Sequence, residues 1–368
     1  MARVRLDTAS EADDLALRRL LAANPMQGRI ALAFEREPSY FAALRVQGPL
    51  AQVLVGRDAE TGEAVAVASR SVKPLYVNGR PRDVGYLADL RVGPAYRGRT
   101  VLARGYRLLQ QLHADGRTDL YYTVIAADNA PALSTIAAGR AGLPAYRDLG
   151  LFNSPAVSLG RAKPVLRAGV ELADGELGLL DAIVACLNEH GAAKQFAPVY
   201  ARRDFEPDGR LADIAPGDFV VALRGGRVVG TVAYWDQTAF KQTRVVAYRG
   251  GLRLLRPLVN ASAPLLGWPR LPRPGAHLRS FYAACVAVEG NDPAIFAALL
   301  RHLYNRAVGG PHAFFVLGLH ERDPLAAALD DYRCSAYRGR LFAVHFADGE
   351  RAYRALDGRI PHVEVATL

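Results

Sequence analysis

The segment Leu87–Leu102 carries the residues whose types and spacing best suit the binding of an anion. It reads as a strand that ends near Pro94, followed by Arg97-Gly98-Arg99 at the start of an expected helix. The first turn of a helix leaves backbone N–H groups unpaired and carries the positive end of the helix dipole. Arginines at the same place add charge-assisted hydrogen bonds to phosphate oxygens. The pattern predicts a pyrophosphate cradle; the turn alone is equally compatible with a solvated, arginine-bearing helix start.

The same segment resembles the motif of the GNAT superfamily of acyl-CoA-dependent N-acetyltransferases. In that family a strand of the form hydrophobic-x-Asp-Leu-x-Val-x-Pro leads to Tyr-Arg-Gly and a pyrophosphate loop. The stretch Asp89-Leu90-Arg91-Val92-Gly93-Pro94-Ala95-Tyr96-Arg97-Gly98 is similar to the first part of this motif. Asn129 is similar to the family's later Asn, which caps the helix after the next strand. The resemblance covers residues 1 to about 160 and, more weakly, residues 170 to 346.

The resemblance implies a binding site for acetyl-CoA as the acyl donor. The backbone of Leu90 and Val92 would pair with the pantetheine arm. The residues expected around the pyrophosphate are Arg97, Gly98, Arg99, Thr100, Val101 and Leu102. Thr100 and Leu102 stand where the family has small residues, so the backbone cannot approach phosphate as closely as glycine allows. Weakened or altered CoA binding is therefore expected.

The catalytic groups depart from the family pattern. The reaction needs a base for the attacking amine and an acid for the leaving thiolate. The positions that usually supply them hold Ala88 and Ile136. Asp89 and Tyr146 are the candidate catalytic residues in their place. Each also has a structural interpretation: alternation along a strand sends Asp89 to the face opposite Ala88, and a strand tyrosine such as Tyr146 commonly belongs to the core.

Two other segments bear on the site. In the second half the corresponding turn reads Val288-Glu289-Gly290-Asn291-Asp292-Pro293, which is acidic and lacks Arg-Gly. Its negative side chains would repel a pyrophosphate, so this copy is not expected to hold CoA. By the resemblance, Glu35 and Glu37 lie on the acceptor side, and solvation at the surface is the alternative for both.

The elements that must position these residues occur in the same order twice. In the first half the pattern predicts strands at 4–6, 52–55, 64–69, 86–92 and 120–126, and helices over 10–21, 38–44, 101–112 and from Asn129. In the second half it predicts strands at 219–221, 228–234, 281–288 and 314–319, and helices over 175–188, 295–303 and from Asp323. The predicted class is α/β (α+β): two tandem GNAT-like domains, each a mixed, mostly antiparallel sheet flanked by helices. Their expected bounds are 1–162 and 171–368, with a linker around 161–170 and the second domain degenerate.

Composition limits the classes of protein to consider. The chain has 368 residues, 51% of them hydrophobic and 22% charged, which suits two globular domains. We find no uninterrupted apolar run of a membrane span and no apolar leader after Met1, so the cytoplasm is the expected compartment. Cys186, Cys285 and Cys334 stand far apart, which argues against a disulfide framework or a zinc site. No metal is expected.

The formal charge of +10 is unevenly placed, and only Lys73, Lys163, Lys194 and Lys241 are lysines among 46 basic residues. Residues 237–288 contain no acidic residue, yet they hold Lys241, Arg244, Arg249, Arg253, Arg256, Arg270, Arg273 and Arg279. DNA binding is not expected, because neither interleaved aromatic residues nor a known module accompanies this charge. The leucine-rich stretch 237–280 could fold over its own domain, pack on a second subunit to form a homodimer, or lie on an anionic membrane. Its five prolines, which break a long amphipathic helix, favour packing on its own domain.

The function that these observations favour is transfer of an acetyl group from acetyl-CoA to a primary amine of a small molecule or peptide. The amine would attack the thioester directly, helped by positioning and by main-chain donors. One alternative is a non-catalytic acyl-CoA-binding or assembly protein, because both usual acid and base positions are apolar. The other is an aminoacyl-tRNA-dependent transferase, since tandem GNAT-like domains also occur in such enzymes and the basic stretch would then meet RNA.

Overall fold

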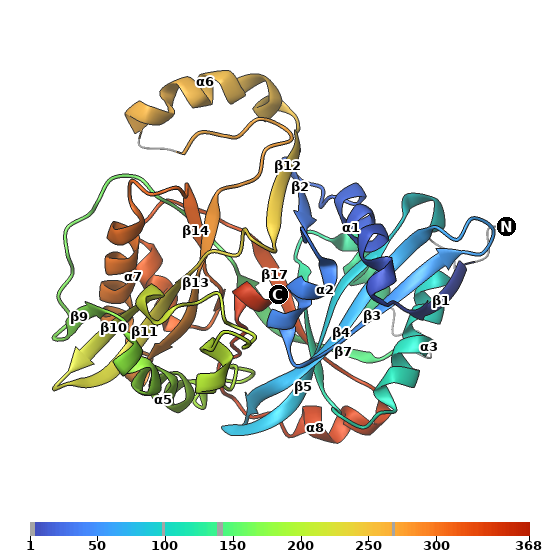
Figure 1. The fold of residues 1–368 in the computed structure, drawn as a ribbon, viewed down its shortest axis with the longest axis horizontal. Coiled ribbons are helices and arrows are strands. Elements are labelled where there is room, and N and C mark those ends of the chain that lie inside the picture. Colours follow the sequence, from blue (N-terminus) through green and yellow to red (C-terminus); the bar gives the residue numbers. More distant parts are fainter. Residues whose placement is uncertain (1–3, 98–99, 138–142, 267–268) are drawn as a thin grey trace.

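The computed structural model describes residues 4–97, 100–137, 143–266 and 269–368. Gly98 and Arg99, which the motif assigns to the pyrophosphate, lie outside the described residues, as does Trp268. Two large sheets lie side by side, and a two-stranded ribbon and a projecting helix rise between them (Figure 1). In the described part of the chain, no helix has the length and hydrophobicity of a bilayer crossing, and no three His, Cys, Asp or Glu residues cluster as metal ligands.

The first sheet has eight strands in the order β1-β3-β4-β5-β6-β17-β7-β15. They are β1 (Val4–Thr8), β3 (Leu50–Asp58), β4 (Ala64–Val77), β5 (Arg80–Val92), β6 (Tyr121–Ala126), β17 (Arg338–His345), β7 (Ala145–Asn153) and β15 (Leu319–His320). Neighbouring strands are antiparallel except β5 and β6, which are parallel. The predicted hairpin between β3 and β4 and the predicted strands at 86–92 and 120–126 are present.

Helices cover both faces of this sheet. They are α1 (Asp14–Ala23), α2 (Tyr40–Leu44), α3 (Val101–His113), α4 (Ala130–Ala137) and α8 (Glu350–Arg354). Alternate residues of β3 face opposite ways: Val53 and Val55 pack with Leu17 of α1, whereas Leu54 packs with Leu109 of α3. The sheet is therefore buried on both sides.

The second sheet has seven strands in the order β16-β8-β14-β13-β11-β10-β9. They are β16 (Cys334–Ser335), β8 (Ala156–Ser158), β14 (Phe314–Val316), β13 (Ser280–Val288), β11 (Arg227–Trp235), β10 (Phe219–Arg224) and β9 (Glu171–Asp174). Helix α5 (Leu180–Gly191) covers one face with Phe219 and Val221, and α7 (Pro293–Ala307) covers the other with Val220 and Ala222. The last predicted helix is a 3₁₀ segment, Pro324–Leu329, capped by Asp323.

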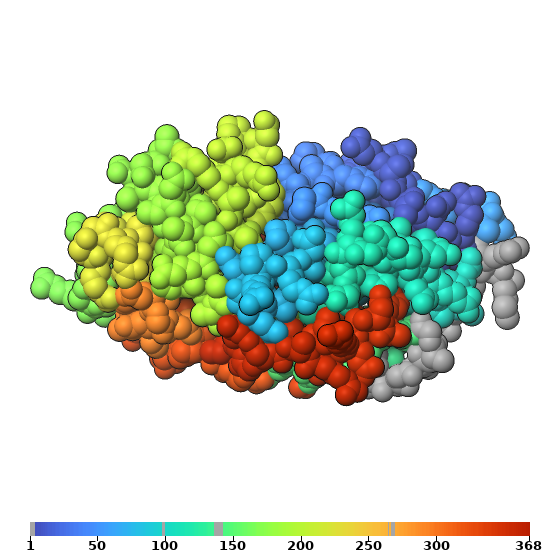
Figure 2. Space-filling view, turned by 90° about the horizontal axis from the view of Figure 1, so that it is seen from below, coloured from blue at the N-terminus to red at the C-terminus, as the bar shows by residue number. Residues whose placement is uncertain are grey.

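The second half of the chain contributes β15 and β17 to the first sheet, and the first half contributes β8 to the second sheet. Strand β17 lies between β6 and β7, with Leu341 opposite both Val124 and Gly150. Strand β8 lies between β14 and β16, with Val157 opposite Phe315. Figure 2 shows the C-terminal segment lying along the surface of the first half. The division at residue 162 stays a prediction, but two interior strands cross it.

Between the sheets, β2 (Ile30–Glu35) pairs with β12 (Gln242–Tyr248), and α6 (Gly251–Leu266) follows β12. The prolines of this stretch were expected to prevent a long helix, and that expectation is wrong: α6 runs through Pro257 and Pro264. Hydrogen bonds to the returning segment offset the helical hydrogen bonds that the two prolines cannot donate. The Asn260 amide donates to the carbonyl oxygen of Leu271 at 3.0 Å and accepts from its N–H at 2.7 Å. The returning segment 269–277 thus holds the helix in place.

Candidate functional site

Strands β5 and β6 form a parallel pair over only two residues, Gly85 with Tyr121 and Tyr86 with Tyr122. A Cβ atom on residue 85 would lie 1.9 Å from the Tyr121 ring. The two strands can therefore approach at this point only because residue 85 is glycine.

Beyond Leu87 the two strands separate. Their last link is Thr123 Oγ1, which donates to the carbonyl oxygen of Leu87 at 2.8 Å. From there β6 continues beside β17, while β5 continues beside β4. In the described residues no strand pairs with the other edge of residues 88–92, and Leu90 is 48% exposed. This edge offers backbone N–H groups to an extended ligand, whereas the carbonyl oxygens of Leu90 and Val92 accept from the side chains of Arg91 and Arg97, each at 3.0 Å.

A β-bulge lies at the start of the open edge. The register with β4 shifts between Ala88 and Arg91, so that Asp89 and Leu90 oppose one residue of β4. Asp89 has φ 55°, in the left-handed region, which Asp tolerates better than most side chains. The bulge breaks the alternation on which the predicted orientation of Asp89 was based. The direction of its side chain is set by the bulge.

The Asp89 carboxylate has two partners from the segment after β2. Arg36 Nη2 lies 2.6 Å from Asp89 Oδ2, and the Tyr40 hydroxyl donates to the same oxygen at 2.9 Å. Burial, reinforced by the charge of Asp89, raises the pKa of Tyr40 well above its usual value, so this hydroxyl stays protonated. Asp89 is thus a well-satisfied carboxylate that anchors the bulge.

A half-buried lysine from the second half, Lys241, lies near the same ion pair. Its Nζ donates to the carbonyl oxygen of Leu368 at 2.5 Å and lies 5.3 Å from the centre of the Tyr282 ring. Burial, with a further contribution from the charge of Arg36, lowers the pKa of Lys241 to about 7; Asp89 opposes that shift. An amine that titrates near neutrality therefore lies within electrostatic reach of the Arg36–Asp89 pair.

A second lysine, Lys73, is fully buried and contacts the same C-terminal segment. Lys73 of β4 donates to Thr367 Oγ1 at 2.8 Å. Burial, followed by the charge of Arg210, lowers the pKa of Lys73 to about 7. Burial raises the pKa of Glu364, which interacts with both lysines. Residues 364–368 thus lie in a polar cluster where the two halves meet.

The predicted pyrophosphate residues surround the start of α3. Arg97 is exposed, and its Nε donates to the carbonyl oxygen of Val92 at 3.0 Å. Thr100 is the N-cap residue of α3 but forms no side-chain capping bond, and the helix has no acidic residue in its first turn. Val101 is buried and Leu102 is half-buried. The described part of this turn therefore leaves the helix N-terminus without a competing side-chain acceptor.

Asn129 caps α4, as the Asn129-Ala130-Pro131 sequence predicts. Its Oδ1 accepts from the backbone N–H of Ala132 at 3.3 Å. The helix N-terminus is thereby fixed just after β6, on the side of the splay opposite β5.

Tyr146 on β7 lies in the core beside α3. Its hydroxyl shares a hydrogen bond with that of Tyr106, and its ring packs edge-on against Phe342 at 6.1 Å. Burial raises the pKa of Tyr146 well above its usual value. Ile136 belongs to α4, and its side chain lies outside the described ones.

The second half also contains a short parallel strand pair and a β-bulge with a positive φ angle. Strands β13 and β14 pair in parallel only over residues 280–282 and 314–316. Cys285 has φ 52°, and the register with β11 shifts beside it, as at Asp89. Here the chain's own acidic groups take the equivalent places. Glu364 accepts from the Cys285 N–H at 2.8 Å, and Asp292 caps α7.

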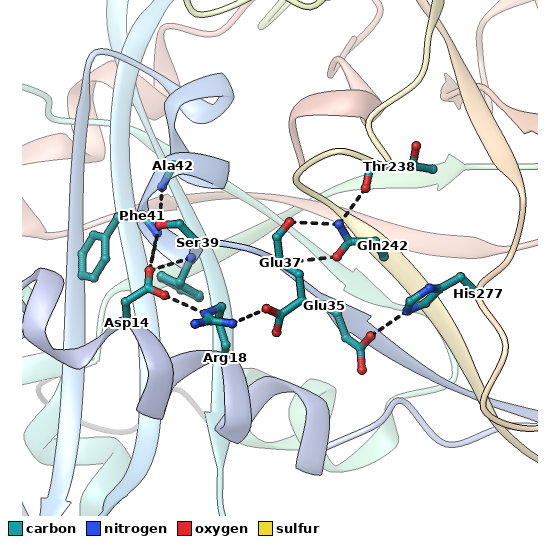
Figure 3. Close-up of polar contacts among 11 residues, drawn as sticks. Asp14, Arg18, Glu35, Glu37, Ser39, Phe41, Ala42, Thr238, Gln242 and His277 are labelled. Carbon is teal, nitrogen blue, oxygen red and sulfur yellow. Dashed lines mark hydrogen bonds and ion pairs between the residues drawn. The ribbon is translucent and has the colours of Figure 1, made fainter.

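Glu35 joins the two halves beside the site (Figure 3). Its carboxylate lies 2.6 Å from Arg244 Nε on β12 and 3.0 Å from His277 Nε2. Glu35 is buried, so solvation at the surface does not describe it.

Glu37 contributes to the same junction mainly through its backbone. Its N–H donates to Gln242 Oε1 at 3.0 Å, and its carbonyl oxygen accepts from Gln242 Nε2 at 2.9 Å (Figure 3). Its carboxylate is half exposed and pairs with Arg18 of α1. Both glutamates thus hold the ribbon in place next to Arg36.

Several residues of the polar cluster were not among the predicted site residues: Arg36, Tyr40, Lys73, Lys241 and Glu364. The lysines had a weak signal, because lysine is rare in this arginine-rich chain. No local pattern distinguishes the others, since their roles depend on contacts between distant segments.

Comparison of the sequence with family models and with curated proteins gives no match. Solved structures do match in fold. Saccharomyces cerevisiae N-myristoyltransferase with bound myristoyl-CoA has a TM-score of 0.62 at 11% identity, over 94% of this chain and 79% of that one. A GCN5-related N-acetyltransferase from Sphaerobacter thermophilus has a TM-score of 0.56 at 16% identity, over 99% and 98% of the two chains.

A third match is the GCN5-related glucosamine N-acetyltransferase region of a fungal multi-domain GH3 β-N-acetylglucosaminidase. The TM-score is 0.60 at 15% identity, over 93% of this chain. This chain spans only 38% of the length of that fungal chain. Together these likenesses show that the chain has the mixed α/β fold of the GNAT superfamily, as predicted from the Asp89–Gly98 motif.

Proposed function

We propose that the protein is an acyl-CoA-dependent N-acyltransferase that binds its donor in the splay between β5 and β6. The observation that carries this proposal is the open edge of residues 88–92 next to the bulge at Asp89. The pantetheine arm is an extended chain with two amide groups, which can pair with such an edge as an added strand would. The structural relatives, which include N-acetyltransferases and an N-myristoyltransferase with bound myristoyl-CoA, support the same kind of reaction.

The donor is assigned to the first half alone, with acetyl-CoA as the proposed thioester. Leu90 and Val92 would pair with the pantetheine. The phosphate-facing group would be Arg97, Gly98, Arg99, Thr100, Val101 and Leu102, with Asn129 across the splay. In the second half, Glu364 already occupies the bulge and Asp292 the helix start, so the chain's own carboxyl groups take the places that an anionic ligand would need.

The reaction joins the amine nitrogen of the acceptor to the carbonyl carbon of the thioester. The C–N bond forms, the C–S bond breaks, the amine loses a proton, and the CoA thiolate gains one. Backbone N–H groups at the bulge are suited to stabilise the negative charge that develops on the carbonyl oxygen. Ala88 and Ile136 cannot exchange protons. Lys241, with a pKa of about 7, is the proposed acceptor of the amine proton in its neutral form.

The test measures acetyl-CoA binding by calorimetry and release of CoA thiol in the presence of mixed primary amines. Arg97→Glu combined with Arg99→Glu is expected to abolish binding, because both changes place negative charge at the phosphates. Arg203→Glu with Arg351→Glu, two exposed arginines elsewhere, is the control with the same change in net charge. Undiminished affinity in the first variant would overturn the assignment.

The same experiment addresses a second candidate, a non-catalytic acyl-CoA-binding protein. The apolar residues at positions 88 and 136 favour that candidate. Acetyl-CoA binding without thiol release for any amine would favour it over the transferase.

A further inference from the structure

The α6 arm, defined as residues 249–277, extends beyond the two sheets. It continues from β12 and projects above the ribbon (Figure 1). Its returning segment is fixed to β12, with the Val245 N–H donating to the carbonyl oxygen of Ala276 at 2.9 Å. The Tyr248 hydroxyl donates to the carbonyl oxygen of Pro272 at 2.7 Å. The described residues of the arm, 249–266 and 269–277, therefore form a projection that is fixed to the ribbon, with α6 at its outer side.

The outer face of α6 is a stripe of exposed leucines. Leu254, Leu258 and Leu265 are 79%, 67% and 86% exposed, and Leu255 beside them is 51% exposed. Residues at these spacings lie on one face of an α-helix. The inner face holds Ala263, which is fully buried. The helix is amphipathic, but its leucine-rich face points to solvent, so packing on its own domain does not account for these leucines.

The arm is also strongly basic. Arg249, Arg253, Arg270 and Arg273 are exposed, and none of them has an acidic partner among the described residues. Residues 237–288 contain no Asp or Glu at all. Beside the helix, a cavity of about 270 Å³ is lined by Arg253 and Arg256 together with Tyr248. Arg256 lies on the inner face and donates to the carbonyl oxygens of Leu271 and Pro272, so the four exposed arginines are the groups available to lipid phosphates.

We propose that the α6 arm docks on an anionic lipid bilayer. The leucine stripe would enter the boundary between headgroups and acyl chains, and the flanking arginines would contact lipid phosphates. A second copy of this chain fits less well, because pairing two stripes would bring two sets of arginines together without any acidic residue of the arm to offset them. Helix α6 projects as a single helix about 24 Å long. This shape can lie along a flat bilayer more readily than it can form the large enclosed interface of a stable dimer.

The test uses the full-length protein and co-sedimentation with vesicles of phosphatidylcholine alone or of phosphatidylcholine and phosphatidylserine in equal parts. We expect binding to the anionic vesicles only, weakening as salt increases. Leu254→Ser with Leu258→Ser and Leu265→Ser should weaken it by about tenfold or more. Arg249→Ser with Arg253→Ser and Arg273→Ser should have an effect of similar size.

Leu177→Ser and Arg203→Ser, at exposed positions outside the arm, are the matched controls and should bind as the unchanged protein does. Circular dichroism checks that every variant is folded. Three results would overturn the proposal: no sedimentation with anionic vesicles at low salt, binding that the leucine variant retains in full, or binding to RNA in place of vesicles. Self-association that the leucine changes abolish, in protein that does not bind vesicles, would assign the stripe to a second copy instead.

Discussion

Arg36 Nη2 lies 2.6 Å from the carboxylate of Asp89, and this ion pair ties the segment after β2 to the bulge of β5. Both side chains are almost fully buried, at 7% and 14% exposure. Strand β2 itself pairs with β12 from the second half. The Arg36–Asp89 pair therefore connects the open strand edge to the junction between the halves.

Asp89→Asn is expected to lower the free energy of unfolding by about 3 kcal/mol, because it leaves the buried Arg36 guanidinium without its counter-ion. Transfer activity of the folded variant should fall by less than about tenfold, since the carboxylate is engaged structurally. Denaturant titration and an initial-rate assay measure the two effects. Asp148→Asn, which breaks the exposed pair with Arg340, is the control and should change stability by at most about 1 kcal/mol. A loss of about 10³-fold in rate with unchanged stability would identify Asp89 as the base.

Tyr146→Phe removes one hydroxyl from the buried Tyr106–Tyr146 pair. Stability should fall by about 1 to 2 kcal/mol, because the Tyr106 hydroxyl loses its partner. The rate of acyl transfer should change little. If instead the rate collapses while the melting temperature stays constant, Tyr146 acts as the general acid.

The exchange of strands predicts that the halves do not fold separately. A fragment of residues 1–162 lacks β17, so the facing edges of β6 and β7 lose their shared partner. We expect this fragment to lack a cooperative unfolding transition, and co-expression with residues 163–368 to restore a soluble complex. Circular dichroism and size-exclusion chromatography follow both outcomes. A fragment that unfolds cooperatively alone would show that β17 is dispensable.

Much of this architecture follows from local sequence. The Asp58–Gly62 turn, the Asn129 cap and the Asp323-Pro324 start each contain the chemistry that their structures need, and all are found where predicted. The repeated order of strands and helices indicated the fold class for the same reason. Local patterns were sufficient for elements whose boundaries depend on neighbouring residues.

The rest depends on contacts between distant segments. The bulge at Asp89 is a shift in pairing between two strands, which neither strand's alternation reveals. Strands β8 and β17 would show the same pattern in either sheet, so their exchange leaves no local trace. The burial of Lys73 is likewise set by residues almost three hundred positions away, such as Thr367. The polar cluster could therefore not be assembled from the sequence.

Lys73 predicts a pH dependence of stability. The pKa of Lys73 is about 7 in the folded protein, whereas in the unfolded chain it has the ordinary value of 10.5. Between these two pH values Lys73 carries a proton in the unfolded chain that it lacks in the folded protein. The free energy of unfolding should rise with pH across this window and fall as pH decreases toward 7. Lys73→Met should reduce the slope by up to about 1.4 kcal/mol per pH unit.

Denaturant titrations between about pH 7.5 and 9.5 measure this slope. Higher pH is avoided because of three buried tyrosines, Tyr40, Tyr122 and Tyr200, whose pKa values burial raises. Near pH 10 these tyrosines ionise in the unfolded chain but not in the folded protein, which lowers the free energy of unfolding and would obscure the slope. Lys163→Met, in the segment between β8 and β9, is the matched control. An unchanged slope in Lys73→Met would show that Lys73 keeps its proton when folded.

Lys241 gives the sharpest test of the proposed chemistry, because Lys73 is a second lysine with the same shifted pKa of about 7. If neutral Lys241 accepts the amine proton, kcat/KM should rise as pH increases through about 7 and be lost below it. Lys241→Met should remove this step, leaving a rise set by the acceptor amine's own pKa and a rate lower by about 10²-fold near neutral pH. Lys73→Met should preserve the step. A pH profile in which Lys241→Met keeps the same midpoint as the unchanged protein would exclude Lys241 and assign the proton to solvent.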